Sequence, residues 1–367
     1  MNILIVLTFN KSLKQWNAEG TLGRELKYYE QLSKISNSKI TFLSYGDKSD
    51  KFFIRNKLGL KVIPIYKTKT NHSKIFNLFY SIYFIIKNIK FFKEFNFVKT
   101  NQNYGSWIGV LFKILNPKIL FISRGGYDLF HFKSLEKNKL HMILSFFICF
   151  ICYKFADKVI VPSDFYSSFV SKKFNIHTSK IYILPNYVDI NLFKKRNSKK
   201  NLNKILFVGR FIEQKNLFNL LRIFSNNKYT LDLLGKGPQK NDLINYSKII
   251  NCKINILEPI KNEKIPNLFS KYKFFILNSY FEGNPKVLLE AMASELLCIG
   301  SDVIGINNII EHKKNGLLID KINLSNSLFD NLNNKKLIKK ININSRKYIV
   351  KNHSLDAIVK KELKIYS

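Results

Sequence analysis

Short apolar runs alternate with longer amphipathic segments along almost the whole chain, and this alternation limits the fold more than any other feature of the sequence. Each run is too short for a helix and is mostly apolar, as expected for a strand buried on both faces of a parallel sheet. Strands are predicted over 3–8, 40–43, 61–65, 97–100, 119–122 and 158–161, and again over 205–208, 230–234, 253–257, 274–277 and 297–300. Helices are predicted over 24–33, 75–92, 107–115, 141–155 and 353–366. The fold class is therefore α/β, with parallel sheets covered on both faces.

The strand series is interrupted by a polar, basic stretch over 191–204, which is typical of a linker. We predict an N-terminal Rossmann-like domain over 1–190, a C-terminal one over 205–350 and a closing helical segment over 351–367. Ligands of doubly wound sheets bind beyond the carboxyl ends of the strands. Two such domains facing each other would form a central cleft.

The 367 residues include 61 Lys and Arg against 25 Asp and Glu, a formal net charge of +36. A field of this sign attracts nucleic acid or an anionic membrane surface. Nucleic-acid-binding domains concentrate basic residues in one stripe or motif, whereas lysine is spread over this whole sequence, so nucleic acid is not favoured. An anionic membrane surface and a plain compositional bias both remain open.

Cys149 and Cys152 form a C-x-x-C inside an apolar run, without the second cysteine pair or histidine that a zinc site requires. Buried thiols in a reducing compartment are predicted. The first residues carry no charged leader or cleavage site, and the run 140–153 is too short to span a bilayer. A cytoplasmic location is predicted, peripheral on the inner face of the membrane if the positive charge binds lipid.

The densest group of candidate functional residues covers 281–293, directly after the predicted strand 274–277. Asn284 is predicted to cap a helix that has Pro285 at its first position. The free N–H groups and positive dipole end of such a helix bind phosphate. Glu282 is predicted in the loop just before this helix and Glu290 about a turn and a half inside it. Both are predicted to face one site, because a spacing of eight residues nearly returns to the same side of a helix. Alternatively, one glutamate caps the helix and the other is a solvated charge.

Two further groups follow predicted strands. Gly209 ends the strand 205–208, and Arg210 and Lys215 come directly after it. Fixed cations stabilise the negative charge that develops on a diphosphate leaving group, although two surface cations in a lysine-rich chain would look the same. Gly235 and Gly237 lie in a Gly-Lys-Gly-Pro turn after the strand 230–234, a weak signal by itself.

Taken in this order, the groups resemble the retaining, nucleotide-sugar-dependent glycosyltransferases of the GT-B fold, family 4. The resemblance is densest over 154–318, and residues 1–153 match more loosely. The matching motifs lie at 156–163, 184–189, 208–210 with Lys215, 235–238, Glu282 to Glu290 and 315–318. The resemblance implies a GT-B architecture, in which two doubly wound Rossmann-like domains face a central cleft.

The resemblance also implies a role for each matching residue. Arg210 and Lys215 are similar to the pair that grips the donor diphosphate. Glu290 resembles the carboxylate that holds the ribose hydroxyls, and Glu282 the one near the donor sugar. The implied catalytic residues are Glu282, Arg210 and Lys215. The implied donor-binding residues are Gly23 (or Gly20 in the same loop), Gly209, Arg210, Lys215, Gly235, Ile260 in the base-binding loop 258–260, Glu282, Asn284, Pro285, Lys286, Val287, Leu288 and Glu290.

The acceptor side departs from the family pattern, which often has His-Gly-x-Asp after a strand of the N-terminal domain. Residues 123–128 read Ser-Arg-Gly-Gly-Tyr-Asp, so Gly125 stands where the histidine would be. Arg124 is predicted to take over part of its electrostatic role, with Gly125 and Asp128 beside it, whereas His131 is predicted to be structural. Tyr187 replaces a usual glycine between the domains.

The implied activity is transfer of a sugar, with retention, from a nucleotide-diphosphate donor to a saccharide or lipid-linked acceptor in polysaccharide or lipopolysaccharide synthesis. No Asp-x-Asp diphosphate–metal motif is present, so no metal or other cofactor is predicted to be required. The Phe-, Ile- and Lys-rich segments 75–92 and 140–155 suit an anionic lipid surface or are core helices. Alternatives are a nucleotide-sugar epimerase, a sugar-phosphate-accepting synthase, or a non-catalytic membrane-associated nucleotide-sugar-binding protein. The presence of both glutamates favours an enzyme.

Overall fold

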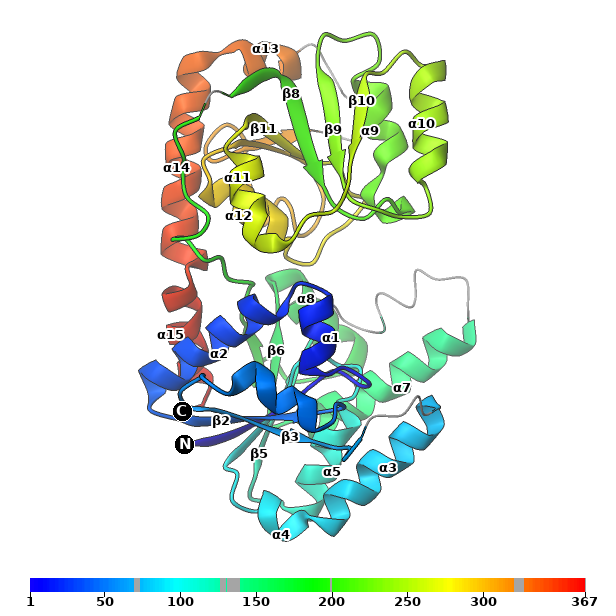
Figure 1. Ribbon diagram of the computed structural model, residues 1–367, viewed down its shortest axis with the longest axis vertical. Helices are drawn as coiled ribbons and strands as arrows, with labels where there is room; N and C mark the ends of the chain where they lie inside the picture. The colour runs from blue at the N-terminus through cyan, green and yellow to red at the C-terminus, as the bar shows by residue number, and fades with distance from the viewer. Residues whose placement is uncertain (69–72, 126–129, 131–138, 199, 320–326, 367) are drawn as a thin grey trace. The chain divides into compact units, whose positions relative to one another are not determined.

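A computed structural model of the protein describes residues 1–68, 73–125, 130, 139–198, 200–319 and 327–366. The chain forms two compact units, of which unit 1 is Met1–Leu184 with Val359–Ser367 and unit 2 is Pro185–Ile358. Each unit contains one parallel sheet with helices on both faces (Figure 1). The prediction of two doubly wound, Rossmann-like units is therefore confirmed, whereas a cleft between them stays a prediction.

The sheet of unit 1 has seven strands in the described residues, in the order β3-β2-β1-β4-β5-β6-β7. All neighbours are parallel. The first strand lies inside the sheet because the chain adds strands on one side of β1 and then crosses to the other side. The strands are β1 (Asn2–Val6), β2 (Lys39–Ser44), β3 (Leu60–Pro64), β4 (Phe97–Thr100), β5 (Leu120–Arg124), β6 (Lys158–Val161) and β7 (Ile181–Ile183).

The helices of unit 1 fall into two groups on opposite faces of its sheet. Crossovers between parallel strands are right-handed, which places α3, α4, α5, α7 and α8 on one face and α1 and α2 on the other. A single apolar core joins the first group to the sheet; it includes Val98, Phe121, Ile85, Phe112 and Phe174. The helices are α1 (Leu13–Ala18), α2 (Leu22–Ser36), α3 (Lys74–Lys87), α4 (Ile89–Phe92), α5 (Trp107–Leu115), α7 (Lys139–Phe155) and α8 (Asp164–Phe174), with 3-10 turns at Lys48–Ile54 and Thr178–Lys180.

The sheet of unit 2 has six strands in the described residues, in the order β10-β9-β8-β11-β12-β13. Its strands are β8 (Asn201–Val208), β9 (Thr230–Leu234), β10 (Ile254–Leu257), β11 (Tyr272–Leu277), β12 (Leu297–Ser301) and β13 (Leu317–Ile319). Its helices are α9 (Leu217–Ile223), α10 (Lys240–Ile249), α11 (Ile265–Phe269), α12 (Lys286–Ala293), α13 (Ser327–Asn333) and α14 (Lys335–His353), with 3-10 turns at Glu213–Lys215 and Asn262–Lys264. The last helix, α15 (Leu355–Tyr366), begins in unit 2 and ends in unit 1.

Every predicted strand is present, and the differences lie at element ends. The predicted helix 75–92 is divided at Asn88, whose side-chain amide donates to the Phe84 carbonyl at 2.7 Å and so competes with continued helix formation. β8 starts four residues early, inside the predicted linker, because the Asn201 N–H donates to the Lys271 carbonyl beside β11. The edge strands β7 and β13 were not predicted. The four cysteines are buried and free, as expected.

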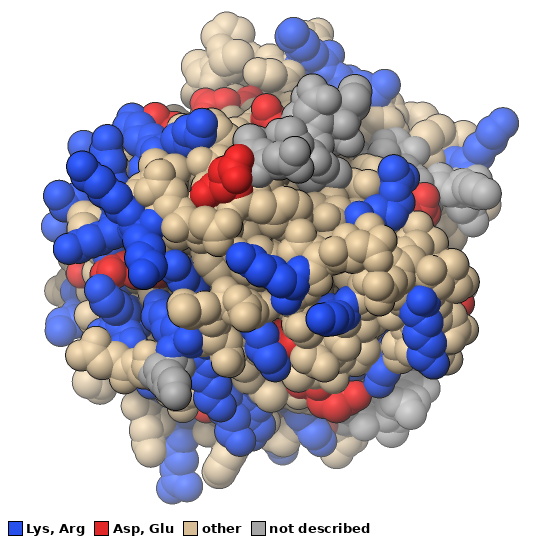
Figure 2. Space-filling view, turned by 90° about the horizontal axis from the view of Figure 1, so that it is seen from above, with Lys and Arg blue, Asp and Glu red and all other residues tan. Residues whose placement is uncertain are grey.

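Basic side chains cover much of the face of the molecule that Figure 2 shows, with few acidic ones between them. They are densest on the side where Figure 1 draws α14. Among the described residues, no helix is both long enough and apolar enough to cross a bilayer.

A buried ion pair attaches the end of α15 to the sheet of unit 1. Lys99 of β4 and Glu362 of α15 are both fully buried and in contact. The hydroxyls of Tyr28 and Tyr366 donate to the same carboxylate. Burial lowers the pKa of Lys99 to about 8, although Glu362 opposes that shift. Burial would raise the pKa of Glu362, but the Lys99 ammonium holds it below its ordinary value.

We expect Glu362→Gln to destabilise the fold by about 3 kcal/mol, because it leaves the Lys99 ammonium buried without a counter-charge. The double variant Lys99→Met/Glu362→Leu should recover most of that loss, since it removes both charges. Urea unfolding measures both values, and a double variant as unstable as the single one would contradict this explanation. Because the Glu362 pKa is lowered in the folded state, the pair's stabilisation should be fully present above the ordinary carboxyl pKa and be lost as the pH falls below it, through the lowered pKa of the folded state.

Candidate functional site

Two loops meet where the sheet of unit 2 changes its direction of growth. β8 and β11 are neighbours, and their carboxyl ends lead into residues 209–216 and 278–285. The Tyr280 N–H donates to the Gln214 carbonyl at 2.9 Å, and the Gln214 side chain donates to the Phe281 carbonyl at 3.0 Å. Doubly wound sheets bind their ligands at such a switch point, so these two loops form the candidate site.

Lys215 and Glu282 form an ion pair across the two loops. The Glu282 carboxylate also accepts a hydrogen bond from the Ser279 hydroxyl at 2.6 Å. Glu282 is 2% exposed, and the side chain of Lys215 is 13% exposed. An unpaired charge in such a position would be costly, so each residue holds the other in place. The fold thus brings together two predicted site residues that are 67 positions apart in sequence.

The helix after β11 begins one residue later than predicted. α12 starts at Lys286, and Pro285 occupies the capping position with an extended ψ of 108°. Asn284 does not cap the helix, because its side-chain oxygen accepts from the Asn186 N–H at 2.8 Å and its carbonyl from the Asn186 side chain at 2.6 Å. The N–H of Val287, in the first turn, has no acceptor among the described residues. A helix start with an open N–H group beside the ion pair is therefore present.

Glu282 and Glu290 contact different loops. Glu282 lies in the loop before α12, as predicted. Glu290 lies within α12, is 6% exposed, and accepts from the Asn262 side chain at 3.4 Å. Asn262 follows β10, whereas Lys215 follows β8. The two carboxylates are thus directed to separate parts of the site.

The glycines of the two turns allow backbone segments to approach each other. A Cβ atom on Gly235 would lie 1.8 Å from the Gly209 carbonyl oxygen, and one on Gly237 would lie 2.3 Å from the Phe211 oxygen. The Phe211 N–H donates to the Lys236 carbonyl at 2.9 Å. The loop after β9 therefore packs on the loop that carries Arg210 and Lys215, which explains these glycines without a ligand.

Arg210 and Ile260 lie nearer the solvent than the ion pair. Arg210 is exposed, and its guanidinium pairs with no acidic side chain in the described part of the chain. Ile260 is 37% exposed in a loop whose Glu258 forms an exposed ion pair with Lys240 at 3.0 Å. Leu288 is fully buried, and its N–H donates to the Pro285 carbonyl. Lys286 is the first residue of α12.

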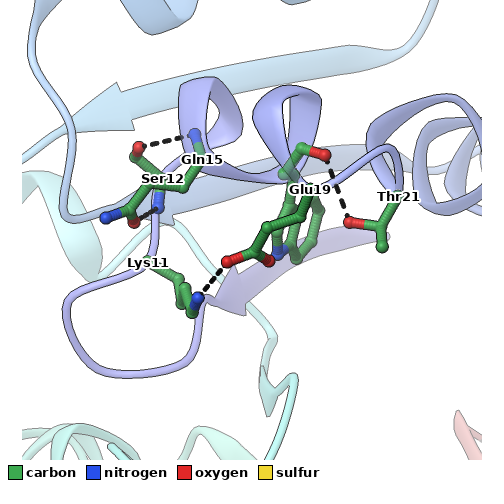
Figure 3. Close-up of polar contacts among 6 residues, drawn as sticks. Lys11, Ser12, Gln15, Glu19 and Thr21 are labelled. Atoms are coloured by element: carbon green, nitrogen blue, oxygen red, sulfur yellow. Dashed lines mark hydrogen bonds and ion pairs between the residues drawn. The ribbon is translucent and has the colours of Figure 1, made fainter. Parts of the chain in front are cut away.

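The predicted glycines of unit 1 lie in a segment that follows β1. Gly20 has a φ of +69°, which favours glycine, and Gly23 is exposed in the first turn of α2. Figure 3 shows how the chain before them is fixed: the Ser12 hydroxyl and the Gln15 side chain cap α1 reciprocally, and Lys11 pairs with Glu19.

Arg124 and Gly125 lie at the carboxyl end of β5, while Asp128 and His131 fall outside the described residues. The Arg124 N–H donates to the Thr100 hydroxyl at 3.0 Å. Burial would lower the pKa of Arg124, but Tyr29, Tyr28 and Glu362 raise it, so the guanidinium stays charged. A Cβ on Gly125 would approach the Tyr153 hydroxyl to 3.2 Å, so a larger side chain would have to displace a neighbour.

Sequence reasoning missed three side chains that hold the site together. Ser279 bonds the Glu282 carboxylate, Asn186 bonds Asn284, and Asn262 bonds Glu290. Asn186 lies in the motif 184–189, to which no role had been assigned, whereas nothing in the local sequence marks Ser279 or Asn262, because serine and asparagine are frequent in loops. In the described residues, no three His, Cys, Asp or Glu side chains come together as metal ligands would.

Two Rossmann-like units with a ligand site at a switch point define the GT-B class of glycosyltransferase folds. The fold agrees over the whole chain with that of sucrose-phosphate synthase from Thermosynechococcus elongatus, with a TM-score of 0.80, 16% identity and 98% of that chain covered. Residues 188–352 match the family model described as glycosyl transferases group 1. This match covers just under half of the chain and lies in unit 2, which is therefore similar to group 1 glycosyltransferases. The resemblance to glycosyltransferases of the GT-B fold is confirmed, whereas retention stays a prediction.

Two characterised relatives are similar over part of their length. One is the UDP-Gal:alpha-D-GlcNAc-diphosphoundecaprenol alpha-1,3-galactosyltransferase of Escherichia coli, 28% identical over 52% of this chain and 54% of that protein. The other is the N-acetylgalactosamine-N,N'-diacetylbacillosaminyl-diphospho-undecaprenol 4-alpha-N-acetylgalactosaminyltransferase of Campylobacter jejuni, 29% identical over 53% and 55%. The matched part of the chain thus spans about half the length of these relatives.

We expect Gly235→Ala to lower the stability of unit 2 by about 1–3 kcal/mol, because the added methyl group would collide with the Gly209 carbonyl. Lys236→Ala is the matched control: it changes an exposed side chain of the same loop and should stay within about 0.5 kcal/mol of the wild type. Thermal unfolding measures both variants. Equal stability of the two would show that the loops are not packed as described.

Proposed function

We propose that this protein transfers a sugar from a nucleotide-diphosphate donor to a saccharide or lipid-linked saccharide acceptor. The observation that carries the proposal is the Lys215–Glu282 pair at the β8–β11 switch point of a unit that is similar to group 1 glycosyltransferases. A buried carboxylate and ammonium held beside an open helix start form a site that can receive both a sugar and a diphosphate.

The donor diphosphate would lie between Arg210, Lys215 and the start of α12. The charge that develops on the leaving group is stabilised by cations and N–H groups that are already in place, which lowers the barrier without a reorganisation step. The Lys215 ammonium already pairs with the Glu282 carboxylate, so the phosphate oxygens would be additional partners of this ammonium. Arg210 is exposed and can turn toward the diphosphate.

The remaining donor contacts follow from the loops around this centre. Glu290 would hold the ribose hydroxyls, and Glu282 would lie near the transferred sugar. The base would contact the loop of Ile260. Further proposed donor contacts are Gly23, Gly209, Gly235, Asn284, Pro285, Lys286, Val287 and Leu288. The side chain of Leu288 is buried, so this residue would contact the donor through its backbone only.

The acceptor would bind on the side of unit 1, where we propose Arg124, Gly125 and Asp128 as neighbours of the reacting hydroxyl. Both relatives are named for acceptors on a diphosphoundecaprenol lipid, which supports a lipid-linked saccharide in polysaccharide or lipopolysaccharide synthesis. An enzyme that acts on a lipid-linked acceptor would lie at the membrane, and we propose that this protein binds peripherally to its inner face. The relatives are transferases, which favours transfer over the epimerase, synthase and non-catalytic alternatives.

Retention of the anomeric configuration belongs to the same proposal. Departure of the leaving group is driven by the electrostatics of the diphosphate site and by the held geometry of the two substrates. We further propose that no divalent metal is required, because Arg210, Lys215 and the α12 start supply the positive charge. Product stereochemistry by NMR tests retention, and an inverted product would exclude it.

We expect Arg210→Ala to weaken nucleotide-sugar binding about tenfold or more, because a charge-assisted contact to phosphate contributes about 1.5–3 kcal/mol. Arg222→Ala removes an exposed arginine of α9 and should bind as the wild type does. Calorimetry or thermal shift with a panel of nucleotide sugars gives the affinities. Equal affinities in the two variants would contradict the diphosphate site.

Glu290→Gln should keep the fold and lose most of the transfer activity, because an amide accepts ribose hydroxyls less strongly than a carboxylate. Activity of the wild type should survive treatment with EDTA. Turnover in Glu290→Gln equal to the wild type, or full loss of activity with the chelator, would overturn the corresponding part of the proposal.

A further inference from the structure

α3 carries apolar side chains on its exposed side as well as on its buried side. Its buried positions include the polar residues Asn77 and Ser81. Asn77 accepts from the Tyr66 hydroxyl at 2.6 Å and donates to Asn10 at 2.8 Å. Its outward positions recur at helical spacing and are large and apolar, with Phe79 66% exposed and Tyr83 55% exposed. Ile85 and Phe84 pack on the core, but a second set of large apolar side chains on this helix faces solvent.

α7 likewise has apolar side chains on both its buried and its exposed sides. Its buried positions hold Ser145, Cys149, Cys152 and Tyr153. The outward positions are again apolar and follow a helical stripe from Leu140 to Phe155, with Leu144 52% exposed and Phe147 56% exposed. Single exposed apolar residues are ordinary, but two helices with continuous apolar stripes outside mark an interaction surface.

Both stripes belong to helices on the same face of the unit 1 sheet. The crossover rule places α3, α5 and α7 on one face. α5 packs against α7, and its Phe112 ring lies 5.0 Å from Phe92 of α4, which directly follows α3. Neither α3–α4 nor α7 contains an acidic residue, while Lys74, Lys87, Lys90, Lys139 and Lys154 are exposed on them. The surface is thus apolar with a basic margin.

We propose that the outward faces of α3 and α7 dock on the headgroup region of an anionic lipid bilayer and insert their aromatic side chains into it. Helices with an apolar face and a lysine margin bind in the plane of such an interface. Lys87 lies 5.6 Å over the Tyr83 ring and Lys154 lies 5.7 Å over the Phe150 ring, so both stems run along apolar surface with the ammonium at its edge. A second copy of the chain is disfavoured as occupant, because each copy carries the same basic margin and a net charge of +36. The inference concerns unit 1 and does not depend on the proposed reaction.

The test uses the full chain with vesicles of phosphatidylcholine alone and of phosphatidylcholine with phosphatidylglycerol. The wild type should bind only the second kind, and binding should fall as salt is raised. Phe79→Gln/Phe147→Gln should lower the partition coefficient about tenfold or more, because two exposed aromatic anchors are lost. The matched control is Phe52→Gln/Leu58→Gln, which changes residues 76% and 93% exposed in the β2–β3 connection on the other face of the sheet. This control should bind within about twofold of the wild type.

Insertion is measured separately by tryptophan fluorescence. Brominated lipids should quench Phe79→Trp and Phe147→Trp but not Phe52→Trp. Equal binding of both double variants, equal binding to both kinds of vesicle, or equal quenching at all three positions would overturn the proposal. So would a dimer, seen by light scattering without lipid, that Phe79→Gln/Phe147→Gln dissociates. Nucleotide-sugar binding by that variant should be unchanged, which separates this result from a failure of the donor site.

Discussion

The candidate site depends on one constraint, the position of β11 directly beside β8. The chain first builds outward from β8 through β9 to β10 and then returns to place β11 on the opposite side of β8. Parallel strands put their carboxyl ends at one edge, so the reversal leaves the two following loops next to each other. Lys215 and Glu282 meet for this reason alone, since no local sequence feature links residues 67 positions apart.

Two ion pairs in the described part of the chain, one fully buried and one partly buried, differ in what surrounds them. Burying a pair of charges is seldom the most stable solution, because apolar residues of similar volume often serve as well. The Lys99–Glu362 pair is enclosed by two tyrosine hydroxyls and attaches α15 to unit 1. The Lys215–Glu282 pair instead retains partial exposure at the lysine, beside a helix start. The first is a structural contact, whereas the second leaves one charge within reach of a ligand.

The sequence predicted the strands well and the site details less well, for physical reasons. Buried parallel strands are short apolar runs with few other interpretations, so their positions could be found directly. β7 and β13 escaped because three-residue edge strands carry little pattern. The start of α12 was misplaced because Asn284 bonds Asn186, 98 positions away, and does not cap the helix. The glutamate pair was found by motif, and Glu282 lies before the helix as predicted, but the separate partners of the two carboxylates, Lys215 and Asn262, could not be predicted from local sequence.

The same comparison explains why α3 and α7 could not be interpreted from sequence alone. Apolar periodicity shows that a helix has an apolar side, and it is usually assumed that this side faces the core. That assumption holds only when the protein core is the one apolar environment that the helix can contact. In α3 the inward side holds Asn77, which bonds two polar partners, as well as the core residue Ile85, while further large apolar side chains such as Phe79 remain outside. The burial of each side chain in the structure, and not the periodicity of the sequence, therefore distinguishes a helix that contacts only the core from one that also faces an apolar environment such as a lipid bilayer.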